Sequence, residues 1–153
     1  MSMFSGMNIS ASALTANRLR MDIISSNLAN ANTTRGKQVN GTWEPFRRKM
    51  VQVAPLNSTP FDAALQAAMG KAAKPAVAGG VKVMKIIEDQ TPFKRVYQPK
   101  HPDADPEGFV LLPNVDPLKE MVDLMTTTKS YEANLTAFNA TKSMMVKTLE
   151  IGR

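Results

Sequence analysis

The single histidine, His101, is followed by acidic residues at positions 103, 105 and 107, a combination that could bind a metal ion. Pro102 and Pro106 predict an extended loop that carries these acids at alternate positions. One imidazole with scattered carboxylates lacks the ligand spacing of a defined zinc or calcium site. We therefore expect a surface turn here and no metal centre.

Other groups that could do chemistry are missing from the sequence. The chain has no Cys, which excludes disulfides, thiolate zinc sites and cysteine nucleophiles. No Ser lies in a G-x-S-x-G context, and the glycines at 70 and 79–80 lack the spacing of a phosphate-binding loop. No pair of carboxylates is spaced in a way that suggests acid–base catalysis. The sequence thus predicts a protein that is not an enzyme and needs no cofactor.

A short basic cluster, Arg47-Arg48-Lys49, follows Trp43 and Phe46 in a chain whose formal net charge is +6. Aromatic and basic side chains together can stack on bases and neutralise phosphates. Three residues are too few to follow a phosphate backbone, and the aromatic residues suit the start of a strand equally well. We expect no nucleic-acid partner, and a basic nucleic-acid-binding module remains a minor alternative.

The two ends of the chain carry the strongest periodicity. From about Phe4 to Asn32, apolar or small residues recur at spacings of three, four or seven, which predicts a helix with a heptad seam. The seam residues are Phe4, Met7, Ala11, Leu14, Met21 and Leu28. Further apolar residues widen this face beyond one stripe, which favours more than one helical neighbour.

A second helix is predicted from about Asp116 to Gly152. Leu124, Tyr131, Phe138 and Met145 lie one heptad apart, and a companion row comprises Met121, Thr128, Leu135, Lys142 and Leu149. Asp116 suits the N-cap, Pro117 the first helical position and Glu120 the first turn. Long terminal helices with matching heptads are expected to pair as a coiled coil.

The middle of the chain holds all but one of the 10 prolines and has a different character. Period-two alternation predicts strands over 50–53 and 81–86, with a third over 93–97. A short helix fits 62–69, and a flexible link fits residues near 70–80. The predicted fold is mainly α, with a terminal coiled coil (1–34 with 116–153) and a small β-containing middle domain (35–115).

The terminal helices need neighbours to complete their core. Their seam side chains are small or medium in size, and 11 of the residues in the chain are Met, which adapts to irregular interfaces. Ordering about 60 residues costs more free energy than a two-helix seam of this kind returns. We therefore expect a structural subunit whose helices become fully ordered by packing against other copies or relatives.

Two terminal segments resemble the signatures of flagellar rod, hook and hook-associated proteins. The first is Ser26–Thr34, and the second runs from Pro113–Met125 through Ser130–Asn134 to Lys147–Gly152. In the middle, segments 93–97 and 101–110 are similar to the short proximal-rod subunits of this family. The resemblance implies a subunit of the proximal rod, part of a drive shaft that transmits torque and encloses an export channel.

The resemblance also implies partners and a location. The partners would be other flagellar rod proteins, copies of this chain, and the export-gate and rod-adaptor proteins, without nucleic acid and without direct membrane insertion. The location would be the flagellar basal body, outside the cytoplasmic membrane in the periplasm or cell-wall zone. The flagellar type III apparatus would export the chain, which agrees with the lack of an ordinary secretory signal.

Candidate assembly residues follow from the seams and the signature. They are Met7, Leu14, Met21, Asn27, Leu28, Asn30, Leu124, Tyr131, Leu135, Phe138, Met145 and Leu149. Asn27 and Asn30 could bond neighbouring backbone or side chains, or could serve only in turns and caps near the helix end. Alternatives to the proximal-rod subunit are another axial flagellar subunit and, less favoured, an exported membrane-active helical protein.

Overall fold

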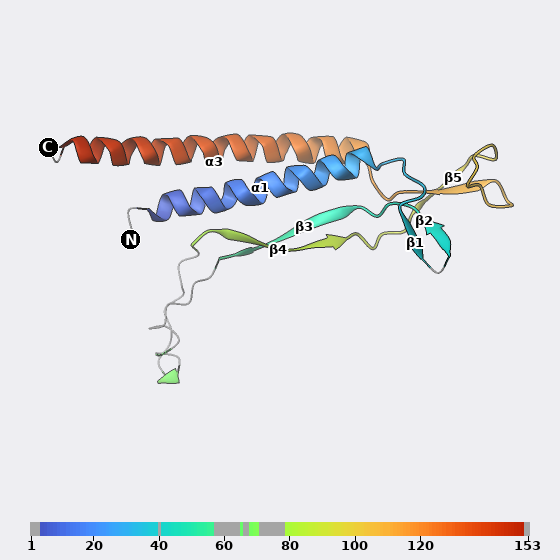
Figure 1. The fold of residues 1–153 in the computed structure, drawn as a ribbon, viewed down its shortest axis with the longest axis horizontal. Coiled ribbons are helices and arrows are strands. Elements are labelled where there is room, and N and C mark those ends of the chain that lie inside the picture. The colour runs from blue at the N-terminus through green and yellow to red at the C-terminus, as the bar shows by residue number, and fades with distance from the viewer. Residues whose placement is uncertain (1–3, 40, 57–64, 66–67, 71–78, 152–153) are drawn as a thin grey trace. The chain divides into compact units, whose positions relative to one another are not determined.

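The computed structural model describes residues 4–39, 41–56, 65, 68–70 and 79–151 of the chain. Figure 1 shows a long helix near each terminus, with strands between them in the sequence. The helix predicted over 62–69 and the link near 70–80 fall mainly outside the described residues. Within the described part of the chain, no helix is long and apolar enough to cross a membrane.

The two terminal helices are confirmed. Helix α1 spans Ser5–Ala29 and helix α3 spans Pro117–Ile151. At the start of α3, the Asp116 carboxylate accepts a hydrogen bond from the Leu118 backbone N–H at 3.1 Å, which is the predicted N-cap. Helix α1 ends before the predicted Asn32. There the Asn30 side chain donates to the Ser26 carbonyl at 2.9 Å and so satisfies a carbonyl of the last turn.

Three two-stranded sheets lie between the helices in the sequence. They pair β1 (Lys37–Val39) with β2 (Thr42–Glu44), β3 (Lys49–Pro55) with β4 (Val81–Glu88), and β5 (Lys94–Tyr97) with β6 (Phe109–Leu112). The predicted strands over 50–53, 81–86 and 93–97 correspond to β3, β4 and β5. Strands β1, β2 and β6 have no more than four residues each, too short to show a period.

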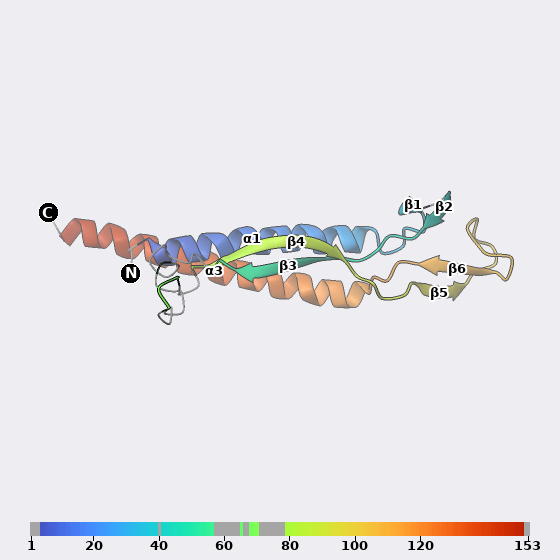
Figure 2. The ribbon, with the colours of Figure 1, turned by 90° about the horizontal axis from the view of Figure 1, so that it is seen from below.

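Two of these sheets are antiparallel hairpins with a defined register. Strand β5 pairs with β6 so that Tyr97 lies opposite Phe109, and the two strands lie side by side in Figure 2. In the sequence, an Asn-Gly dipeptide, which is a hairpin turn signal, separates β1 from β2, and Gly41 has a φ of 85° that suits glycine. That dipeptide was the one local signal that could have predicted the first hairpin.

The contacts divide the chain into two compact units. The first comprises Met1–Arg18, Val53–Met84 and Lys129–Arg153, and the second comprises Leu19–Gln52 and Lys85–Thr128. In the first unit, the Ser12 hydroxyl accepts a hydrogen bond from the Val81 N–H at 3.1 Å, which ties the start of β4 to α1. The second unit holds most of the buried residues, and the site described below lies wholly within it.

The burial of the helices follows heptads but differs from the predicted companion row. Residues 124, 131, 138 and 145 are half-buried, as are residues 7, 14, 21 and 28 of α1. The second inner row of α3 falls at 120, 127, 134 and 141, where Glu120 and Thr127 are buried. Leu135 and Leu149 of the predicted companion row are exposed. The inner face of α3 is therefore half polar, and coiled-coil pairing along its length stays a prediction.

Candidate functional site

Two asparagine side chains hold the backbone at the start of β3. Asn27, in the last turns of α1, accepts from the Lys49 N–H at 2.9 Å and donates to the Lys49 carbonyl at 2.8 Å. A residue on a neighbouring antiparallel strand makes the same pair of hydrogen bonds with its backbone N–H and carbonyl. Asn114, just before α3, accepts from the Arg48 N–H at 2.8 Å. Amide groups from two distant segments thus satisfy the backbone where a sheet partner would otherwise be needed.

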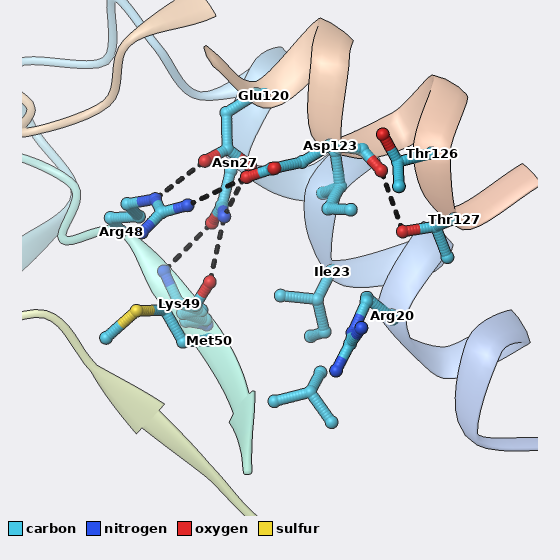
Figure 3. A pocket seen from close by; sticks show the side chains of 12 residues that line it. Arg20, Ile23, Asn27, Arg48, Lys49, Met50, Glu120, Asp123, Thr126 and Thr127 are labelled. Carbon is cyan, nitrogen blue, oxygen red and sulfur yellow. Dashed lines mark hydrogen bonds and ion pairs between the residues drawn. The ribbon is translucent and has the colours of Figure 1, made fainter. Parts of the chain in front are cut away.

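The second feature is a buried ion pair at the start of α3. Glu120 has a relative exposure of 0%, and one carboxylate oxygen accepts from Arg48 Nε at 2.6 Å. The other oxygen accepts from Asn27 Nδ2 at 3.1 Å. Its place in the first turns of α3 also favours a negative charge, because the helix dipole is positive there. Figure 3 shows Arg48 and Asn27 converging on Glu120.

Arg48 faces two further carboxylates. Its guanidinium lies 3.5 Å from Asp123 Oδ2 and 3.7 Å from Asp89 Oδ2. The pKa of Asp89 is lowered, first by the Thr91 backbone N–H and to a smaller degree by the charge of Arg48. We call the set of interacting residues the Arg48 network: Asn27, Arg48, Asp89, Asn114, Glu120 and Asp123.

The Arg48 network holds together the elements that carry its residues. In the described residues, no buried side-chain nitrogen or oxygen lacks a hydrogen-bond partner, so the desolvated charges are compensated. The network joins the end of α1, the start of β3, the end of β4 and the start of α3. No Ser, Thr, Cys, Lys or His side chain belongs to it, and the described residues contain no group of three or more side chains placed to hold a metal ion.

The three residues of the basic cluster make contacts with other residues of the same chain. Arg47 lies over the ring of Phe93, with its guanidinium carbon 4.4 Å from the ring centroid. Lys49 lies 5.5 Å from the centroid of Phe46, and Arg48 belongs to the network. Arg47, Lys49 and Phe46 of the segment that suggested a nucleic-acid alternative thus make cation–π contacts inside the second unit.

A second polar contact joins the N-terminal signature to the loop that carries the single histidine. Asp103 accepts from Arg35 Nε at 2.8 Å through one oxygen and from the Thr34 hydroxyl at 2.8 Å through the other. These two hydrogen bonds, that of Arg35 first, hold the pKa of Asp103 below its ordinary value. The acid that suggested a metal ligand therefore fixes a loop.

Replacing Asp103 with Asn is expected to flatten the acid limb of the stability profile. Since the folded pKa of Asp103 lies below the unfolded value of about 3.9, its contribution is complete above that pH. The contribution is lost as the pH falls through the folded pKa. Urea unfolding at a series of pH values below about 5 measures this. Asp105→Asn, the same change two residues away, is the control, and equal profiles for the two variants would contradict the assignment.

The structure places the predicted assembly residues in three settings. Asn27 is buried at 1% exposure and bonded within the chain, whereas Asn30 is half-buried and bonded to its own helix end. Met21 contacts α3, where the Thr128 hydroxyl lies 3.7 Å from its sulfur. The remaining seam residues are half-buried, apart from exposed Leu135 and Leu149. Whether any of them contacts another subunit remains a prediction.

Sequence reasoning missed five of the six members of the network. It places Arg48 in a basic cluster and Glu120 only in a helix turn, and it gives no role to Asp89, Asn114 and Asp123. Arg48 and Glu120 are 72 positions apart, so no local spacing joins them. The one available signal was an acidic residue four positions before Leu124, on the seam side of a helix where an apolar residue is usual.

Comparisons with known proteins match both ends and the full length of the chain. Residues 7–37 match the family model described as flagella basal body rod protein, and residues 107–151 match that of the flagellar basal body rod FlgEFG protein C-terminal. The flagellar basal-body rod protein FlgC of Bacillus subtilis (strain 168) is 56% identical over 153 residues, covering 100% of both chains. FlgC of Escherichia coli O157:H7 is 42% identical and that of Salmonella typhimurium (strain LT2) is 41% identical, each over 95% of both chains. The resemblance seen in the terminal signatures is confirmed.

Proposed function

This chain belongs to the FlgC family of flagellar basal-body rod proteins and is a structural subunit of that rod, and we propose that it assembles there through its two terminal helices. The proposed place is the proximal rod, where the subunit transmits torque and helps to enclose the export channel. In this proposal, residues 1–34 and 116–153 form the coiled-coil part, and residues 35–115 form a small middle domain.

The observation that carries this proposal is the imbalance between buried and exposed apolar side chains. Among the described residues and apart from Pro and Gly, four apolar residues are buried, namely Ala16, Ile24, Val110 and Val115. Twenty large apolar side chains are exposed, nine of them on α3. Exposed apolar surface on this scale marks contacts with other proteins. Neighbouring helices in a rod would cover these side chains and supply the missing burial.

The hydroxyl groups of α3 suit such burial. Thr136 and Thr148 donate to the carbonyls of Glu132 and Met144 at 2.9 and 2.8 Å, so their donors are satisfied before any partner arrives. Burying a polar group that lacks a hydrogen bond costs free energy, and these groups avoid that cost. A surface of methyl, thioether and internally bonded hydroxyl groups can therefore pack against another helix without unpaired polar atoms.

Family membership supports a proposal for the finer partners and the location. We infer contacts with other rod proteins, with further copies of this chain and with the export-gate and rod-adaptor proteins. The subunit would reach the periplasm or cell-wall zone through the flagellar type III apparatus. The proposal involves no enzymatic activity, cofactor or nucleic acid, and no direct membrane insertion.

The proposal is tested by placing a charge on the exposed end of α3. Leu149 is 76% exposed, so Leu149→Asp should leave the stability of the isolated subunit within about 0.5 kcal/mol. In a strain that lacks the chromosomal gene, the same variant should abolish rod assembly and swimming. Electron microscopy of isolated basal bodies and motility on soft agar measure the two effects.

The matched control is Asn139→Asp, which adds the same charge at an exposed polar position of α3 with almost no change in shape. It should retain swimming. Normal rods with Leu149→Asp would exclude Leu149 from the assembly contacts. A deletion strain that still builds rods and swims would contradict the rod function itself.

A further inference from the structure

The first turns of α3 carry an apolar ridge that faces away from the Arg48 network. The ridge comprises Leu118, Met121, Val122 and Met125. Leu118, Val122 and Met125 are 76%, 61% and 67% exposed, which is unusual for neighbouring large apolar residues. At about 100° per residue, the four lie within an arc of about 100°, while buried Glu120 and Thr127 lie on the opposite side of the helix.

On that opposite side, the second unit contains a groove of about 230 Å³. Its apolar lining comes from Ile23 and Ile24 of α1 and from Met50 and Val51 of β3. The charged residues of the lining are Arg20, Arg48, Lys49, Glu120 and Asp123, of which Arg48 and Glu120 are paired with each other. Figure 3 shows Arg20 and Ile23 along one side of it. The volume is below the roughly 300–1,000 Å³ of ordinary ligand sites, so side chains of a protein fit it better than a small molecule.

We propose that the ridge of one copy of this chain docks into the groove of a second copy. This inference rests on the proposed rod function and names one contact within it. Because the ridge and the groove lie on opposite sides of the same helix segment, a copy that receives a ridge still presents its own. Such head-to-tail contacts generate rings or helical arrays, as a rod requires.

The charges around the two surfaces are complementary. Asp116 precedes the ridge at the N-terminal end of α3, and Lys119 lies on its flank; both are exposed. The groove offers Arg20, for which the described residues provide no ion pair, and Asp123, whose side chain is 45% exposed. An Asp116–Arg20 pair and a Lys119–Asp123 pair between copies would favour this register over others. A partner whose surface carried only positive or only negative charge could form only one of these two ion pairs.

The natural lack of cysteine makes a cross-linking test direct. One copy carries Val122→Cys and a second, differently tagged copy carries Arg20→Cys, both at exposed positions. The two are co-expressed in the gene-deletion strain, and a short thiol-specific bifunctional reagent is applied to isolated basal bodies. We expect a cross-linked dimer that contains both tags. Replacing Arg20→Cys by Lys100→Cys, which is exposed in the same unit but remote from the groove in sequence and element, should give at least tenfold less dimer.

A second measurement covers variants that fail to enter the rod. Purified copies with Met125→Cys and Arg20→Cys are mixed at high concentration and treated with the same reagent, and the dimer should again exceed that of the Lys100→Cys control. Equal cross-linking with the control, no dimer in either assay, or cross-links only to other rod proteins would overturn the docking of copies. The unaltered chain should restore rods and swimming in the same strain. That result would support the rod function even if the docking of copies were overturned.

Discussion

Replacing Arg48 with Met should lower the free energy of unfolding by about 3–5 kcal/mol. The change leaves the Glu120 carboxylate buried, without its 2.6 Å partner and with Asp89 and Asp123 close by. An uncompensated buried charge is costly because the surrounding protein solvates it poorly. Urea unfolding followed by circular dichroism measures the loss, and the single Trp43, which lies in the same unit, gives a second probe.

Two further variants separate loss of the ion pair from loss of packing. Arg48→Met combined with Glu120→Leu removes both charges, and most of the lost stability should return because no charge remains unpaired. Arg95→Met breaks the exposed Arg95–Glu107 pair, at 3.5 Å, and should cost less than about 1 kcal/mol. If Arg48→Met lowered the free energy of unfolding no more than Arg95→Met, the network would contribute little to stability. Its assignment as the contact that holds these elements together would then be wrong.

Replacing Asn27 with Asp is expected to destabilise the second unit by about 3 kcal/mol or more. The side-chain nitrogen of Asn27 donates both to the Lys49 carbonyl and to Glu120. A carboxylate in its place has no proton to donate and sets a second negative charge about 3 Å from Glu120. The bond from the Lys49 N–H can persist, so the loss comes from the two donor contacts. The same urea titration measures it.

Asn30→Asp is the matched control for this change. Asn30 is half-buried, and its side-chain nitrogen makes a single bond, to the Ser26 carbonyl of its own helix. Losing that one local hydrogen bond should cost about 1 kcal/mol. A loss at Asn27 no larger than at Asn30 would mean that both asparagines serve only as helix-end residues, the simpler of the two interpretations of the signature.

These two changes also separate folding from assembly. Asn27 and Arg48 act inside one subunit, whereas Leu149, Val122 and Arg20 are exposed. Variants at the first pair should therefore lose stability as isolated subunits and lose rods as a consequence. Leu149→Asp should lose rods while the isolated subunit keeps its stability, and the Val122→Cys and Arg20→Cys copies should keep that stability and cross-link to each other.

The terminal helices and the family were predictable because their signals are local. Heptad spacing at 124, 131, 138 and 145 depends only on neighbouring positions, and the same residues are half-buried in the structure. The Asp116 cap and the alternating strands over 50–53 and 81–86 are equally local patterns. The signature segments at the two ends carried enough information to identify the family without any knowledge of the fold.

Only the tertiary structure decided what the polar residues do. Asn27 bonds to the backbone of Lys49, which is 22 positions away in the sequence, and Glu120 pairs with Arg48, which is 72 positions away. Charge and hydrogen-bonding capacity are visible in a sequence, but the identity of a partner depends on how helices and strands are brought together. A buried Glu is tolerated on the inner row of α3 only because that packing delivers a guanidinium and an amide to it. Periodicity therefore determined the elements, and long-range packing determined the network that joins them.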